Sequence, residues 1–352
     1  MFKLNETPVR TSRNFNINNI KLKDVNMPEI INDFTSYEII NKTDEINVET
    51  AKSDFNIIYG LGDILVNQVK KSANKNIKLI IDGKKSKEAI LQFNFDKANN
   101  TLVENIEIVA EKGANATIVI KYESDKEKNY FHNGIIRLVA KENSNINIVI
   151  TNLLNEYSNN FMTIENTLES NTNVDYTIID FGGKNSITNY YSNLIGEKSK
   201  NNINTIYLGK DSQLFDLNYI GELRGEKSFI DIEVIGALKD EAKKHFKGTI
   251  DFKKGAKKAK GNENEYCMLL SDNAKSIALP MLLCSEEDVE GNHSSSAGKI
   301  GEKELFYIMS RGFKLKEAMK LMVRAKFNKV LANIKNDKLK EEIIEEIDKR
   351  LD

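Results

Sequence analysis

The sequence is poor in the residues that build most recognisable sites. It has no tryptophan, two cysteines, three histidines and three prolines among 352 residues. Cys267 and Cys284 are too few for a disulfide framework, and in a reducing compartment they are free thiols, small core residues or ligands. Any chemistry at a defined site must therefore come from very few side chains.

The chain also lacks an excess of one charge. Lys+Arg 51 and Asp+Glu 52 nearly cancel, so no overall field attracts nucleic acid or a membrane surface. No stretch approaches the ~18 consecutive apolar residues of a membrane span, and residues 1–19 have no apolar segment typical of a signal peptide. The sequence therefore predicts a cytoplasmic protein that binds neither nucleic acid nor membranes.

The common enzyme motifs are missing as well. There is no phosphate-binding P-loop, no dinucleotide-binding glycine loop, no nucleophile elbow and no paired CxxC. Carbohydrate-active β-helix enzymes use clustered carboxylates, and four aspartates here fall on predicted strands: Asp175, Asp180, Asp216 and Asp231. Strand-borne acids more often face solvent, so the sequence favours a protein without catalysis and leaves a carbohydrate-active enzyme as an alternative.

What the chain does contain is a repeat. Ile106–Ile120 resembles Ile136–Ile150 with an offset of about 30 residues, which lies within the range of solenoid units. The same offset predicts two interior rows, one of Ile118, Ile148, Ile178 and Leu208 and one of Ala116, Ile146, Tyr176 and Ile206. Each unit consists of a strand, an Asn- or Gly-containing turn, and a second strand.

Two architectures could bury this pattern. A β-sandwich needs no fixed period, whereas a parallel β-helix stacks equivalent residues into rows. The sustained register favours a mainly β fold with a parallel β-helix core. A protein with this fold could also be a purely structural repeat protein, without chemistry at any site.

The two ends differ from the core. Residues 61–75 have helical periodicity, and from Glu302 three helices are expected, the first ending at Gly312. We predict a mixed α/β region at 1–100, a β-helix core at 101–300 and a helical region at 301–352. Because solenoid ends need capping, the helical tail is expected either to cap the stack or to present a docking face.

Four residues carry side chains that suit zinc or iron–sulfur sites: Glu265, Cys267, Cys284 and His293. Their spacing matches no compact metal motif, and His293 alone could equally be a hydrogen-bonded loop residue. The lysine-rich segment 238–261 could bind phosphate or an acidic partner, or simply form a solvated face.

The segment from His245 onward resembles the C-terminal core of the SufB/SufD family, the scaffold subunits of the SUF iron–sulfur cluster assembly system. The matching elements are "HFKGTIDF", "LLSDNA", Pro280, "DVEGNH" and "GKIGEKELFYIMSRG". The resemblance covers about residues 100 to 330 and is most like SufD. It implies a right-handed parallel β-helix flanked by terminal helices, which agrees with the repeat.

The resemblance also implies partners. Family members pair edge to edge, SufB with SufD, and each recruits the ABC ATPase SufC through its C-terminal helical region. This chain would then be a non-catalytic scaffold that pairs with a SufB-like subunit, or with a second copy of itself as a SufB-type homodimer. It would hold no cofactor stably alone, and a transient iron–sulfur cluster would form at the subunit interface.

Residue by residue, the family's interface histidine falls on His293, but the neighbouring positions depart from the family pattern. A cysteine of many SufD chains is replaced by Gly291, and a glutamate of SufB by Ser294. The essential cysteine of SufB aligns with Glu265, with Cys267 two residues further on the same strand face. In the predicted SufC-docking helices we expect Leu305, Phe306, Tyr307 and Arg311 to supply the contacts.

Overall fold

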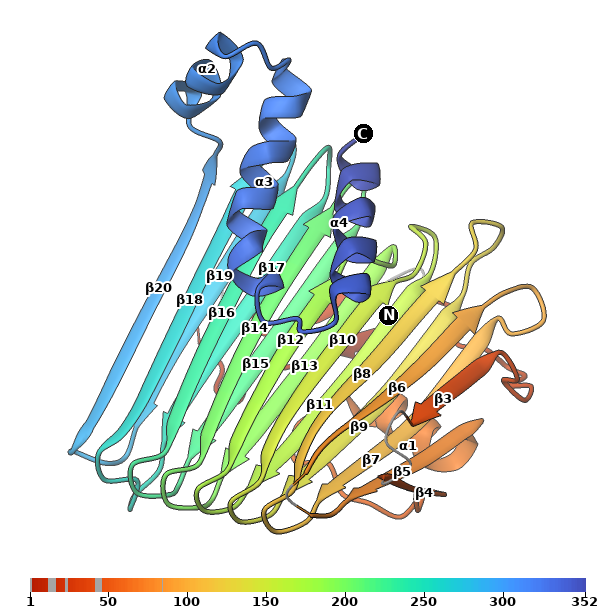
Figure 1. Cartoon of the computed structure of the whole chain (residues 1–352), viewed down its shortest axis with the longest axis vertical. Helices are drawn as coiled ribbons and strands as arrows, with labels where there is room; N and C mark the ends of the chain where they lie inside the picture. Colours follow the sequence, from red (N-terminus) through yellow and green to blue (C-terminus); the bar gives the residue numbers. More distant parts are fainter. Residues whose placement is uncertain (1, 12–16, 23–24, 42–45, 84) are drawn as a thin grey trace.

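The computed structural model describes residues 2–11, 17–22, 25–41, 46–83 and 85–352. Two nine-stranded sheets face each other and form a flattened β-solenoid (Figure 1). From β5 onward, even-numbered strands build one sheet and odd-numbered strands the other, so each coil contributes one strand to each; β3 joins the even sheet, β4 the odd sheet, and β1 pairs with β2 in a separate two-stranded sheet. From β5–β6 to β19–β20 the strands make eight coils, all stacked in parallel. The predicted parallel β-helix is confirmed.

The even sheet contains β3 (Tyr37–Asn41), β6 (Ser86–Phe95), β8 (Asn115–Ser124), β10 (Asn145–Leu153), β12 (Asn173–Asp180), β14 (Lys200–Gly209), β16 (Phe229–Leu238), β18 (Ala259–Leu269) and β20 (Val289–Lys299). The odd sheet contains β4 (Ile46–Glu49), β5 (Lys75–Ile81), β7 (Thr101–Ala110), β9 (Phe131–Ala140), β11 (Asn159–Leu168), β13 (Asn185–Leu194), β15 (Leu214–Leu223), β17 (Lys243–Phe252) and β19 (Lys275–Cys284).

The predicted repeat register is correct at its start and wrong further along. Ile118 pairs with Ile148 as expected, but Ile148 then pairs with Tyr176, and Tyr176 with Ile203. The turns between these coils are shorter than in the first repeat, so the offset drops below 30. As a consequence Ile206 and Leu208, both predicted to be interior, lie on the outer face of their sheet among the residues that pack with the C-terminal helices.

From β7–β8 to β17–β18, the turns from the odd to the even sheet share one left-handed position. It is occupied by Gly113, Asn143, Asn171, Lys198, Lys227 and Lys258, all with φ between 56° and 74°. Glycine and asparagine adopt this conformation readily, which explains part of the asparagine content. Asparagines also form ladders along the even sheet, where the Asn173 side chain donates to Asn145 at 3.0 Å.

The space between the sheets is mainly apolar and filled by isoleucine, leucine, phenylalanine and tyrosine side chains. A buried polar chain crosses several coils within it. The His132 ring contacts the Asn160 side chain at 2.6 Å, Asn160 donates to Ser186 at 3.0 Å, and Ser186 donates to Asp180. Each of these groups has a partner, as buried polar groups require.

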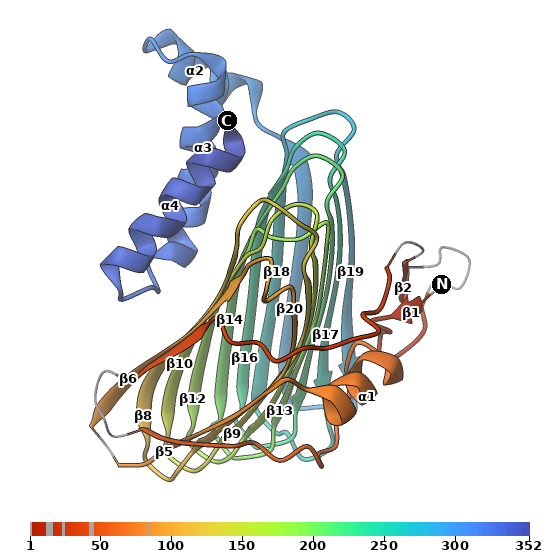
Figure 2. The same ribbon diagram turned by 90° about the vertical axis from the view of Figure 1, so that its right-hand side faces the viewer.

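The termini cover opposite outer faces of the solenoid (Figure 2). On the odd sheet lie β1 (Phe2–Leu4), β2 (Ile20–Leu22) and α1 (Asp63–Ser72), with Leu61, Leu65 and Val69 packed on Phe131 and Phe161. There the buried Asn5 side chain donates to Asp216 at 2.6 Å, and Lys247 pairs with the same carboxylate at 2.6 Å. The predicted helix within 61–75 is confirmed.

The helical tail consists of α2 (Glu302–Ser310), α3 (Leu315–Leu331) and α4 (Asp337–Leu351). The predicted helices are confirmed; the first ends at Ser310, two residues before Gly312, which has φ 97°. Val323 and Phe327 of α3 and Ile343 of α4 pack on the outer face of the even sheet. The tail therefore lies along the side of the stack, and its expected capping role is wrong. The helix α2 projects beyond the stack and has no buried residue.

Candidate functional site

The two ends of the solenoid are finished differently. At the N-terminal end, β3 and β4 pair antiparallel with the first coil, and Phe34 is fully buried in the core beside them. At the other end, β19 and β20 are the edge strands of their sheets. Within the described residues no element covers that end, and most of β20 is exposed on both faces. The last coil therefore presents its interior row and two open strand edges.

His293 lies in the middle of β20, on the interior row. Its register partner on β18 is Glu263, which in turn pairs with Ile232 on β16. Earlier coils fill this row with buried apolar or aromatic side chains: Ala89, Ile118, Ile148, Tyr176, Ile203 and Ile232. The row thus changes from apolar to carboxylate and imidazole over the last two coils. His293 is exposed, so it is a strand residue at an open end rather than a loop residue.

Glu265 and Cys267 follow Glu263 on the interior face of β18. Glu265 is buried and fully engaged: Lys244 Nζ lies 2.6 Å from its Oε1, and Ser295 of the last coil donates to its Oε2 at 2.8 Å. Lys244 is itself fully buried. Such a pair is stable only because both charges are matched and hydrogen-bonded.

Cys267 is completely buried and has Ala297 as its register partner on the last coil. Burial raises the pKa of its thiol, while the nearby Lys244 ammonium opposes this shift. A buried thiol with a raised pKa has little thiolate character. Cys267 therefore has the environment of a core residue in this conformation.

Cys284 lies elsewhere. It ends β19, is exposed, and its sulfur contacts the Glu286 carbonyl at 2.9 Å. Its register partner is Phe252, on the opposite sheet from His293 and its neighbour Glu263. Across the described part of the chain, no three His, Cys, Asp or Glu side chains gather into a group that could hold a metal ion. The last coil brings His293 near Glu263, and not near Cys284.

Glu263 was not among the predicted site residues. Only 1% of it is exposed, yet neither carboxylate oxygen has a hydrogen-bond partner within the described residues. Burial, helped by the neighbouring charge of Glu265, raises the pKa of this carboxyl to about 8. The alternation Gly261, Glu263, Glu265, Cys267 was a usable sequence signal, because residues two apart share a strand face.

The lysine-rich segment forms β17, a turn and the start of β18. The solvated-face interpretation is wrong for two of its lysines, because Lys244 and Lys247 are buried ion-pair partners of Glu265 and Asp216. The four aspartates considered for carbohydrate chemistry do not converge. Asp216 is on the outer face of the odd sheet, Asp180 is buried at the end of β12, and Asp175 and Asp231 lie in one outward row of the even sheet, separated by Asn202.

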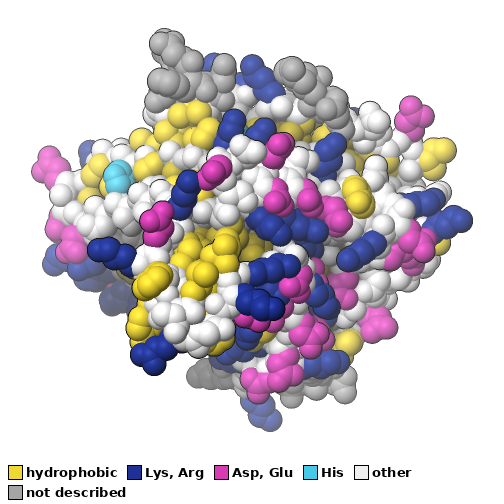
Figure 3. Space-filling model, turned by 90° about the horizontal axis from the view of Figure 1, so that it is seen from above, with side chains coloured by type: hydrophobic (Ala, Val, Ile, Leu, Met, Phe, Trp, Pro, Cys, Tyr) yellow, Lys and Arg dark blue, Asp and Glu magenta, His cyan; other side chains and the backbone are white. Residues whose placement is uncertain are grey.

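The predicted docking residues lie on α2. Phe306 is 74% and Tyr307 60% exposed, and Leu305 is half-buried. Arg311 donates to the Tyr307 hydroxyl at 3.1 Å and lies over its ring. Two further exposed apolar residues nearby, Met309 and Phe313, were not among the predicted docking residues, and Leu315 at the start of α3 is exposed as well. Viewed from this end, the molecule shows apolar side chains grouped among lysines and acids (Figure 3).

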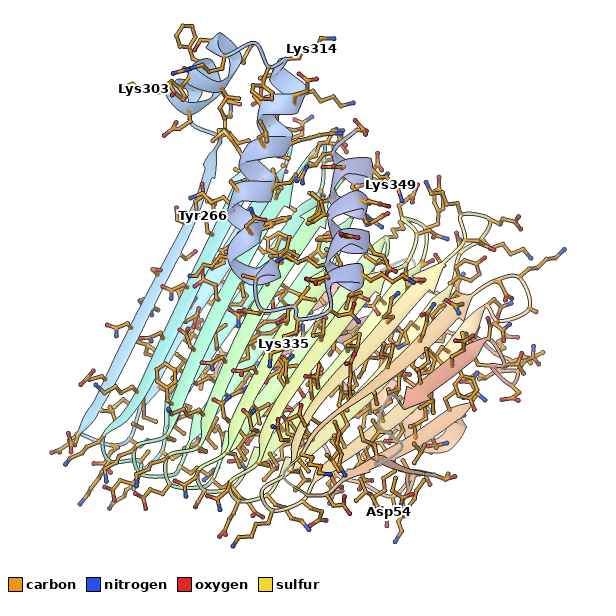
Figure 4. The ribbon with its side chains drawn as sticks, viewed as in Figure 1. Asp54, Tyr266, Lys303, Lys314, Lys335 and Lys349 are labelled. Atoms are coloured by element: carbon orange, nitrogen blue, oxygen red, sulfur yellow. The ribbon has the colours of Figure 1, made fainter. Side chains whose placement is uncertain are left out.

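Charged side chains surround this helical end. Lys303 on α2 and Lys314 before α3 both lie beyond the ends of the sheets, whereas Lys335 precedes α4 and Lys349 lies in its last turn (Figure 4). Tyr266 on β18 lies beside α3, where the Lys326 ammonium is 4.8 Å from its ring centroid. No described helix is both long and apolar enough to cross a bilayer.

The fold and the uncapped coil define a β-solenoid protein with a C-terminal helical arm. Residues 93–326 match the family model of the SufBD core domain of SUF-system iron–sulfur cluster assembly. The chain therefore belongs to the SufBD family.

Relatives agree with this assignment. The iron–sulfur cluster assembly protein SufD of Bacillus subtilis is 24% identical over 72% of this chain and 59% of its own length. SufD of Escherichia coli is 22% identical over 68% of this chain and 57% of its own length. A SufBD family protein of Pyrococcus horikoshii is 28% identical over 66% and 50%, respectively. The chain thus spans little more than half the length of these relatives.

Proposed function

We propose that this chain is a SufD-like scaffold subunit without catalytic activity of its own. It supports iron–sulfur cluster assembly in the cytoplasm at an interface with a SufB-like partner, and it recruits a SufC-like ABC ATPase. Family membership and the SufD relatives support the assembly role. The observation that carries the interface is the uncapped last coil, whose open edges β19 and β20 can pair with strands of another subunit.

His293 is the cluster-proximal residue in this proposal. It projects from the interior row of the exposed strand, where a second subunit would complete the surroundings of a nascent cluster. Glu265 and Cys267 support the strand beneath it, and Cys284 lies at the far end of β19. The chain would hold no cluster stably alone; in support, no three His, Cys, Asp or Glu side chains among the described residues gather into a metal-binding group.

The ATPase would bind the arm formed by α2 and the start of α3. Phe306, Tyr307 and Arg311 are exposed residues of the types that dominate binding hot spots.

The division into a mixed region at 1–100, a core at 101–300 and a helical region at 301–352 remains part of this proposal. Because the chain spans little more than half the length of its relatives, the proposal does not extend to their other activities.

Co-purification tests the proposal. The chain, co-expressed with a SufC-like ATPase, should retain it, and truncation after Ile300 should abolish retention. Because α3 and α4 pack on the even sheet, truncation also uncovers apolar surface, so a Phe306→Ala/Tyr307→Ala variant is the sharper test. We expect at least about 100-fold weaker ATPase binding, since two hot-spot residues commonly contribute 2 kcal/mol or more each.

Ile64→Ala is the matched control, because Ile64 is 54% exposed on α1, on the opposite side of the solenoid. It should leave ATPase binding unchanged. Full-length protein that retains no ATPase would refute the recruitment role. Native mass then separates the two assemblies: one copy with a SufB-like chain supports the main proposal, and two copies of this chain support the SufB-type homodimer.

A further inference from the structure

Glu263 is the most unusual side chain of the last two coils. It is 1% exposed, and both of its carboxylate oxygens lack a hydrogen-bond partner among the described residues. Its neighbour Glu265, on the same face of the same strand, is held by Lys244 and by Ser295. The fold therefore satisfies one of two adjacent carboxyls and leaves the other free.

Space for this carboxyl comes from a glycine. A Cβ added at Gly248 of β17 would lie 2.2 Å from the Glu263 carboxyl carbon. In the corresponding interior row, preceding coils carry Ile106, Ile136, Ile164, Tyr190 and Tyr219. The row becomes glycine only where the acid needs room. The side chain is thus accommodated by its opposite strand while no group binds its oxygens.

A buried, unpaired carboxyl is costly. Leaving a buried polar group without a hydrogen-bond partner is unfavourable, and six earlier coils show that an aliphatic or aromatic side chain fits the row of Glu263. Energetically expensive polar groups of this kind are characteristic of functional sites. The expected ligand is a cation that binds the Glu263 carboxylate. It would approach from the last coil, the end of the solenoid that no described element covers.

His293 stands on that side. It is the next residue of the same row, and neighbouring strands are about 4.8 Å apart, so an imidazole and a carboxylate from these positions can reach one ion. No described residue holds the Glu263 carboxyl over Gly248 by a hydrogen bond, so rotation of this side chain toward β20 breaks none. Imidazole with carboxylate suits divalent first-row metals such as Fe²⁺.

We propose that Glu263 and His293 form a two-residue half-site for a divalent first-row metal ion. The inference rests on the proposed function, in which iron is cargo of the scaffold. The ion would enter from the open end of the solenoid, and its remaining ligands would come from water or from a subunit docked on β20. Glu265 is not a ligand, because Lys244 and Ser295 already bind its oxygens.

Anaerobic calorimetric titration of the full-length chain with Fe²⁺ tests this site, with Co²⁺ absorption as a second readout of coordination. Glu263→Gln and His293→Ala should each weaken Fe²⁺ binding by at least about 10-fold. The double variant should be little weaker than either single one, because the two ligands act as a chelate. Glu290→Gln is the matched control, since Glu290 is an exposed β20 residue paired with Lys260.

The result that would overturn the proposal is Fe²⁺ affinity unchanged in either single variant, or no binding by the parent protein. Thermal melting of each variant without metal establishes that it is folded, and Glu263→Gln is expected to be at least as stable as the parent. Failure of the metal site can be distinguished from failure of the proposed function. A chain that retains its ATPase and partner but binds no Fe²⁺ refutes only the metal site. A chain that binds Fe²⁺ through Glu263 and His293 but retains no ATPase refutes only the recruitment role.

Discussion

Glu263 and Glu265 differ in one respect that sets their energetics. Both are buried on the same face of β18, but only Glu265 has a cationic partner, Lys244. A matched buried pair is tolerated because each charge compensates the other. An unmatched carboxyl is tolerated only in its neutral form, which is why the pKa of Glu263 is raised to about 8.

This difference predicts a pH dependence. Because the pKa of Glu263 is higher in the folded chain than its ordinary value of 4.5, its ionisation opposes folding as the pH rises from 4.5 to 8. Glu263→Gln removes this penalty. We expect the variant to exceed the parent in free energy of unfolding by about 2–3 kcal/mol at pH 7, and by almost nothing at pH 4.5, in chelator-treated urea titrations.

Glu265→Gln is expected to lower the free energy of unfolding, whereas Glu263→Gln raises it. Glu265→Gln leaves Lys244 as a buried charge without its partner, so it should destabilise the protein by about 3–5 kcal/mol at neutral pH. If both variants were destabilised at pH 7, or if the gain from Glu263→Gln did not depend on pH, the proposed environment of Glu263 would be wrong.

Some turns between coils hold a non-glycine residue in a left-handed backbone conformation, which lowers the stability of the fold. Lys258 occupies the left-handed position with φ 59°, where Gly113 stands in an early coil. Non-glycine residues are disfavoured in this conformation. Lys258→Gly should therefore raise the free energy of unfolding by about 0.5–1 kcal/mol, measured by urea denaturation.

The neighbouring Lys257→Gly is the control for this turn. Lys257 has no positive φ, so glycine there only adds freedom to the unfolded chain and should destabilise the protein slightly. Equal effects of the two substitutions would show that the shared left-handed position does not limit turn stability.

The strands and helices were predictable because their periodicity is local. Two-residue alternation identified the strands, and Gly312 marked the end of α2. The register over distant coils was not predictable, because turns differ in length by one to three residues and each difference shifts all later rows. Thus Ile148 pairs with Tyr176 instead of Ile178.

The candidate site was only partly accessible from sequence. His293, Glu265 and Cys267 could be placed by resemblance and by strand alternation. Lys244 could not be paired with Glu265, because they lie on opposite sheets and meet only through the stacking of β17 and β18. Glu263 became notable only when its interior row proved apolar in every earlier coil and its oxygens proved unpaired.

At the scale of the whole molecule, the decisive feature is the asymmetry of the solenoid. Antiparallel strands close the N-terminal end, the C-terminal helices lie along one side, and the last coil is left open beside the projecting α2 (Figures 1 and 2). Open edge strands are normally blocked in monomeric proteins. This arrangement places the proposed partner interface and the proposed ATPase arm next to each other.

Hydrogen–deuterium exchange of the chain, alone and mixed with a SufB-like subunit, tests the central claim most directly. If the last coil is the partner interface, those amides of Val289–Lys299 that do not bond to β18 should exchange rapidly in the free chain and become strongly protected in the complex, while β3 at the capped end stays unchanged. A complex that forms with unaltered exchange in β20, or the absence of any complex, would contradict the account.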